Sequence, residues 1–162
     1  MKKAVYLLSV LALAGCNEDD VKDLVEGNTK VFAVSGAQVE GINGVDDGYY
    51  DLDYITSNTS ISPDEMPVGT KQDLENLNID IEGETCGRID IGDEGVCFKE
   101  GDSSSCVPSE VKMLGLAVYT IDLDEVKTAA DHGFYPKLAS DVGGLFVDID
   151  FKEVSCSTLE AL

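Results

Sequence analysis

The sequence is poor in basic residues: 11 Lys and Arg stand against 32 Asp and Glu, and the formal net charge is −21 at pH 7. Proteins that bind phosphate backbones do so with clustered Lys and Arg, so this composition excludes nucleic acid as a partner. Such a charge favours basic protein faces, divalent cations or neutral ligands. The same charge is also typical of proteins adapted to remain soluble or to live in a salty habitat.

The sequence contains no Trp and a single His, His132. It has no G-x-S-x-G turn, no glycine-rich phosphate loop with Lys and no H-E-x-x-H motif. His132 comes near the end of an expected helix, where a histidine more often complements the helix dipole than acts as a base. We therefore assign no catalytic residue and expect a non-catalytic protein.

No apolar run reaches the length of about 20 residues that a membrane-spanning helix needs. The run at the N-terminus, residues 4–15, follows Lys2 and Lys3 and ends just before a polar, acidic segment, residues 17–20. A basic start, a short apolar stretch and small residues at its end are typical of an export signal.

The end of this run, Leu13-Ala14-Gly15-Cys16, resembles the lipobox of bacterial lipoprotein precursors. The resemblance implies that the Cys16 thiol receives a diacylglyceryl group and that residues 1–15 are removed as a signal peptide. Two or three acyl chains anchor a protein stably to a membrane where one chain does not.

Asn17 would then be the second residue of the mature protein. By the same resemblance, this residue favours transport to the outer membrane. We expect a lipid-anchored protein of the bacterial cell envelope, most simply at the outer membrane. Residues 16–29 are expected to form a lipidated tether, and residues 30–162 a single disulfide-stabilised β domain.

The four other cysteines are Cys86, Cys97, Cys106 and Cys156. An even number of cysteines after an export signal indicates two disulfides, and the lack of C-x-x-C spacing argues against zinc. If residues 101–102 form the two-residue turn of a hairpin, Cys97 lies opposite Cys106 at a distance that a disulfide spans. By elimination, Cys86 then pairs with Cys156.

Alternation of apolar and polar residues and β-branched composition predict about seven short strands. They cover residues 30–39, 49–55, 77–83, 86–91, 96–100, 110–123 and 145–156. Residues 110–123 form the longest apolar stretch and are expected to be a central strand that is buried on both faces.

One short helix is expected after Asp122, which fits a capping box with Glu125 and would lead into a helix that stops at Gly133. Residues 56–70 are rich in Ser, Asn, Pro and Gly and are expected to be a loop. The fold class that follows is mostly β, an antiparallel sandwich or barrel with one short helix. The alternative is an α+β fold with one helix covering an antiparallel sheet.

Asp46, Asp47, Asp51 and Asp53 form the densest acidic stretch and are candidate ligands for Ca²⁺, which needs six to eight hard oxygen atoms. The EF-hand pattern is absent. A solvated strand face explains the same residues more simply.

We expect a membrane-anchored, non-catalytic accessory or interaction module for another envelope protein that carries a basic face. The alternatives are a Ca²⁺-dependent surface-binding or adhesion module and, second, a small envelope hydrolase.

Overall fold

The computed structural model describes residues 25–62, 66–92, 95–100, 103–137 and 151–159, together with residues 22 and 161. Cys16, the hairpin turn at residues 101–102 and the first half of the C-terminal strand expected at residues 145–156 lie outside these residues. The described elements, in chain order, are β1 (Asn28–Val39), β2 (Gly48–Asp51), α2 (Leu52–Asn58), α3 (Lys71–Asn76), β3 (Gly83–Asp90), β4 (Cys97–Glu100), β5 (Ser103–Cys106), β6 (Val111–Asp122), the 3₁₀ helix η2 (Leu123–Glu125), α4 (Val126–Ala130), β7 (Tyr135–Pro136), β8 (Lys152–Val154) and α5 (Cys156–Leu159).

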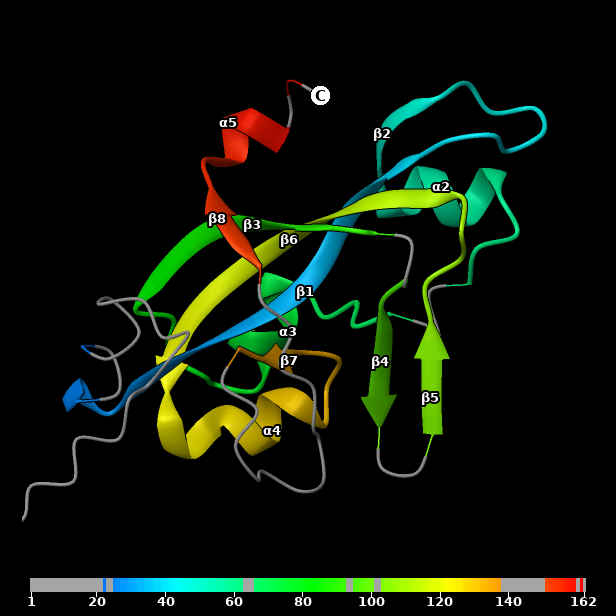
Figure 1. Cartoon of the computed structure of the whole chain (residues 1–162). Coiled ribbons are helices and arrows are strands. Elements are labelled where there is room, and N and C mark those ends of the chain that lie inside the picture. The colour runs from blue at the N-terminus through cyan, green and yellow to red at the C-terminus, as the bar shows by residue number, and fades with distance from the viewer. Residues whose placement is uncertain are drawn as a thin grey trace, which may run out of the picture.

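Six strands form one antiparallel sheet in the order β2-β1-β6-β3-β8, with β7 also paired to β1 (Figure 1). The hairpin β4–β5 forms a second, two-stranded sheet. The mostly β, antiparallel fold is therefore confirmed. The barrel is not, because the described strands form an open order in which β2 and β8 lie at opposite ends.

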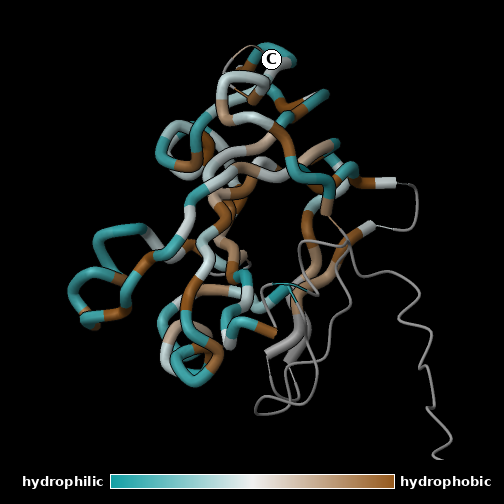
Figure 2. Tube along the Cα trace, turned by 90° about the vertical axis from the view of Figure 1, so that its left-hand side faces the viewer, coloured by the Kyte–Doolittle hydropathy of each residue, from teal (hydrophilic) through white to brown (hydrophobic). Residues whose placement is uncertain are grey.

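Strands β1 and β6 are the centre of the sheet. Each has 12 residues, and they pair from Asn28↔Asp122 to Val39↔Val111. As expected, β6 is buried on both faces: Leu114 and Leu116 enter one core, whereas Tyr119 and Ile121 enter another. Hydropathy follows this arrangement, with hydrophobic residues along the inner strands and hydrophilic ones in the outer loops (Figure 2).

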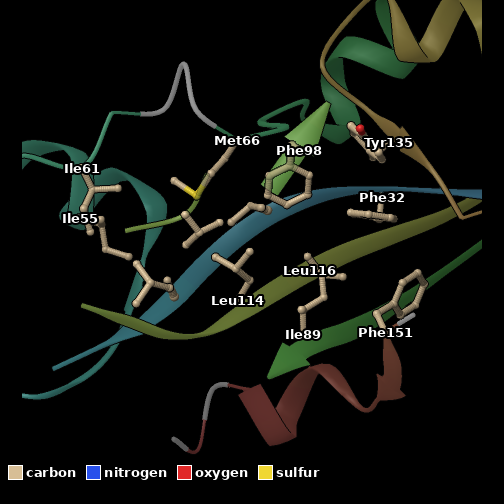
Figure 3. Packing of buried hydrophobic residues seen from close by; sticks show 14 of the residues in the cluster. Phe32, Ile55, Ile61, Met66, Ile89, Phe98, Leu114, Leu116, Tyr135 and Phe151 are labelled. Carbon is tan, nitrogen blue, oxygen red and sulfur yellow. The ribbon is translucent and has the colours of Figure 1, made fainter. Parts of the chain in front are cut away.

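The first core lies on the sheet face that is covered by α2, the segment after it and the β4–β5 hairpin. Figure 3 shows Ile55 and Met66 from the covering segments pointing toward Leu114 and Leu116 of the sheet. Aromatic rings close one side of this core: the Phe32 ring lies 5.3 Å from Phe151, edge to face, and 5.8 Å from Tyr135. Such pairs add about 0.5–1.5 kcal/mol each beyond their buried area.

The second core lies on the opposite face and is covered by α3 and α4. Leu74 of α3 and Ala129 of α4 are fully buried there, beside Phe134. The capping box of α3 joins Thr70 and Asp73. The helix expected after Asp122 is present as η2 and α4, but Asp122 makes no side-chain cap bond, so the capping box predicted at that residue is wrong.

One predicted strand is too long and another is wrong. Within residues 49–55 the strand ends at Asp51, whose carboxylate accepts a hydrogen bond from the Tyr54 N–H at 2.7 Å and starts α2. Residues 77–82 are irregular because the chain leaves α3 through Asn78, at φ 57°, and then buries Ile79 in the second core. Residues 52–55 and 77–82 therefore show that an alternating pattern can be accommodated without a strand.

The two ends of the domain also differ from expectation. β1 starts at Asn28, two residues inside the segment expected to be tether. At the other end β8 covers only Lys152–Val154, and Cys156 already begins α5.

The structure contains both predicted disulfides. Cys97 lies directly opposite Cys106 in the β4–β5 register, and the two are bonded. Cys86 of β3 is bonded to Cys156 across a sequence separation of 70 residues. In the chain-entropy model a loop of that size stabilises the folded state by about 4 kcal/mol.

A buried charge cluster also holds the C-terminal segment. Lys30 Nζ of β1 lies 2.8 Å from Glu153 Oε1 of β8, and Lys137 Nζ lies 3.1 Å from the same oxygen. The two lysine side chains are only 9% and 13% exposed. Burial alone would raise the pKa of Glu153, but the hydrogen bonds from Lys30 and Lys137 outweigh it and lower that pKa below its usual range.

Replacing Glu153 with Gln should lower the free energy of unfolding by about 2–3 kcal/mol, because two buried ammonium groups lose their common counter-ion. Urea unfolding at pH 7 measures the loss. Lys152→Gln is the matched control, since it breaks an exposed 2.9 Å pair with Asp90 and should cost at most about 1 kcal/mol.

The pH dependence provides a second readout. A lowered carboxyl pKa stabilises the folded state above the unfolded-state pKa of about 4.3 and loses that contribution as the pH falls through the folded-state value. The difference between Glu153→Gln and the unchanged protein should therefore shrink below pH 4. An equal difference at all pH values would contradict the ion-pair explanation.

Candidate functional site

A hollow on the second face of the sheet arises from small side chains at adjoining positions. On β6, Gly115 and Ala117 occupy successive positions on this face. Opposite them, the register of β1 shifts between Val34 and Gly36, which makes Ser35 the extra residue of a β-bulge. Bulges redirect side chains and often lie beside functional sites.

Tyr49 of β2 fills one end of this hollow. A Cβ at Gly115 would clash with the Tyr49 hydroxyl, and a Cβ at Gly36 would clash with the Tyr50 carbonyl oxygen and then with the same hydroxyl, so both positions favour glycine. The Tyr49 hydroxyl also hydrogen-bonds the Ser35 side chain. The tyrosine ring thus covers the glycine pair and leaves the surface around Ser35 and Ala117 open.

The open part is a groove of about 470 Å³, which we call the α2–α3 groove. Its floor includes Ser35, Ala117 and Tyr119. One wall consists of Asp51 with residues 52, 53 and 56 of α2, and the other of residues 68–71, which lead into α3. This volume is within the range of small-ligand sites, about 300–1,000 Å³.

The groove is acidic. Asp51 and Asp53 line it and are both exposed. Lys71 also lines it, but its Nζ lies 2.6 Å from Glu84 Oε2, and this hydrogen bond raises the Lys71 pKa above its usual range. Because Glu84 balances the Lys71 charge, the two aspartates leave the groove negative.

Tyr119 is the aromatic residue of the floor. It is only 4% exposed, and its ring lies 6.0 Å from Phe134, edge to face. Burial raises the pKa of Tyr119, and the neighbouring Glu84 raises it further. The phenol therefore remains neutral at physiological pH.

A second hollow, of about 520 Å³, lies on the other side of the Lys71–Glu84 pair. Glu75, Asp80 and Glu84 line it. This face of the molecule is thus acidic on both sides of a single ion pair.

The four aspartates predicted as Ca²⁺ ligands have separate roles. Asp47 Oδ1 accepts a hydrogen bond from the Gly41 N–H at 2.9 Å, and Asp51 caps α2. The Asp46 backbone carbonyl accepts from the Tyr50 hydroxyl. Among the residues that the structure describes, no group of three or more His, Cys, Asp or Glu is placed to hold a metal ion. Asp51 and Asp53 share the groove, but the structure does not bring all four aspartates together, and the Ca²⁺ site stays a prediction.

His132 lies just after α4, where its Nδ1 donates to the carbonyl of Thr128 at 2.8 Å. It thus binds a carbonyl of the last helical turn, which is consistent with the interpretation of this histidine as a helix-end partner.

The sequence did not identify Ser35, Thr56, Lys71 or Tyr119 as site residues. The one local signal was the pair of small residues, Gly115 and Ala117, within the apolar stretch 110–123. Glycine inside a strand often marks a close approach of another group, and here that group is Tyr49.

Comparison of the chain with protein-family models, with curated proteins and with solved structures found no match. Within the described part of the chain, every helix lacks the length and apolarity needed to cross a membrane.

Replacing Asp51 with Ala should lower the free energy of unfolding by about 1 kcal/mol, because α2 loses its N-cap acceptor. Asp51→Ser retains an acceptor and should cost a few tenths of a kcal/mol at most. Urea unfolding measures both variants, each in millimolar Ca²⁺ and in a chelator. A Ca²⁺-dependent rise in the free energy of unfolding that Asp51→Ser abolishes would instead establish Asp51 as a metal ligand.

Proposed function

We propose that this protein is a membrane-anchored, non-catalytic lipoprotein of the bacterial envelope that acts as an accessory or interaction module for another envelope protein. The proposal rests on the ion pairs that the few basic side chains form with carboxylates of the same chain. The basic side chains found in ion pairs with carboxylates are Lys22, Lys30, Lys71, Arg88, Lys127, Lys137 and Lys152. Internal pairing leaves the excess of acidic groups to determine the outward field.

That field suits a partner with a basic face. Complementary charge steers association and selects among partners more than it adds affinity. Exposed acids occur around α2, at Asp46, Asp47 and Asp53, and near the start of β1, at Asp80 and Asp124. An interaction surface of this kind requires no catalytic group.

The anchor is the second part of the proposal. The resemblance of residues 13–16 to a lipobox supports lipidation at Cys16, and Asn17 supports placement at the outer membrane. Residues 17–27 would then connect the lipid to β1, which begins at Asn28.

Replacing Cys16 with Ser should abolish both lipidation and membrane attachment, because only a thiol forms the thioether. Mass spectrometry of the protein expressed in a bacterium with lipoprotein processing should show acyl chains on Cys16 in the unchanged chain alone. Cys156→Ser is the control and should keep the lipid. Membrane-bound, acylated Cys16→Ser protein would contradict the anchor.

Crosslinked pull-down of the full-length lipidated protein from its own membranes should capture one stoichiometric protein partner. Because the attraction is between exposed charges, capture without crosslinking should fall in high salt and survive a calcium chelator. Loss of the partner on chelation would favour the Ca²⁺-dependent adhesion module. The absence of any enriched partner, or turnover in a hydrolase screen, would contradict the proposal.

A further inference from the structure

We propose that the α2–α3 groove binds an arginine side chain of the partner protein. This inference rests on the proposed function and specifies where on the acidic domain the basic partner docks. The groove unites features that a single arginine uses: negative charge, hydrogen-bond acceptors and apolar surface.

Charge selects a cation. Asp53 is exposed in the first turn of α2 and lines the groove beside Asp51. Asp51 Oδ1 accepts the Tyr54 N–H, but a carboxylate has about four lone-pair sites, so it retains acceptor capacity. Because Lys71 is paired with Glu84, no cation in the groove offsets the two aspartates fully. An anionic ligand would be repelled.

Shape selects a side chain with an apolar stem. Ala117 and the Tyr119 ring form part of the floor, and Leu52 and Val68 contribute apolar surface to the walls. Arginine buries its methylene groups on such surface while its charged end reaches polar groups. A bare metal ion would gain nothing from these apolar contacts, and the described acids do not form a metal-binding group.

The head group favours arginine over lysine. A guanidinium is planar, bonds carboxylates through two parallel N–H groups and stacks on aromatic rings. The groove offers the Asp53 carboxylate and the Thr56 hydroxyl, and Tyr119, which is only 4% exposed, belongs to its lining. The Thr56 hydroxyl donates to the Asp53 carbonyl at 3.2 Å, so its oxygen keeps lone pairs that can accept a hydrogen bond.

The test is an NMR titration of the full-length lipidated protein in detergent micelles with N-acetyl-arginine methylamide. The amide resonances around residues 53, 56 and 119 should shift and saturate, with about millimolar affinity for so small a probe. The citrulline analogue has the same shape without the charge and should bind at least about tenfold more weakly.

Variants localise the binding. Asp53→Asn should weaken arginine binding by about fivefold to tenfold, through loss of a charge-assisted hydrogen bond. Asp53→Glu retains the charge and should restore most of it. Glu40→Gln removes one exposed acid outside the groove lining and should change affinity less than twofold.

Three outcomes would overturn the inference: equal binding of the citrulline probe, shifts spread evenly over the acidic surface, or equal weakening by Asp53→Asn and Glu40→Gln. The partner pull-down separates this failure from failure of the proposed function. A partner captured equally by Asp53→Asn overturns the groove alone, whereas the absence of any captured partner overturns the proposed function, and with it the partner's arginine, even if the groove binds the free probe.

Discussion

The antiparallel pairing of β1 with β6 is the interaction on which the rest of the structure depends. These two strands pair along almost their whole length and bury side chains on both faces. A sheet buried on both faces needs two covering layers. The α2 segment and the β4–β5 hairpin cover one face, and α3 and α4 cover the other. Each remaining element therefore has its place because it covers, or extends, this central pair.

The α2–α3 groove is a consequence of irregularity in the same pair. Where the register shifts after Val34, small residues adjoin each other on one face, and the covering helices do not fill the space between them. The Tyr49 ring fills the space beside the glycine pair, Gly36 and Gly115, and leaves the rest of the hollow open. A regular ladder with large side chains at these positions would pack more stably. The hollow is thus a local departure from packing that leaves polar groups accessible to a ligand.

The charge distribution connects stability with recognition. Lys30 and Lys137 are buried around Glu153 and fasten β8 to the opposite end of the chain, while the disulfide from Cys86 to Cys156 fastens the segment that follows. Cations used in this way are not available to balance the surface. In the folded protein the acidic composition therefore gives an ion-paired contact around Glu153 and a negative exterior.

The sequence by itself determined the features that depend on a local residue pattern or on the positions of the cysteines relative to a hairpin turn. The central strand β6, the presence of a short helix after Asp122 and both disulfides follow from nearby residues and from cysteine spacing. Tertiary structure decided the rest. Residues 52–55 and 77–82 alternate like strands, but the cap at Asp51 starts a helix in the first segment and the burial of Ile79 leaves the second irregular. The groove brings together residues near positions 35, 53, 71 and 119, and no local pattern records which distant segments will meet, because that depends on how the covering layers pack on the sheet.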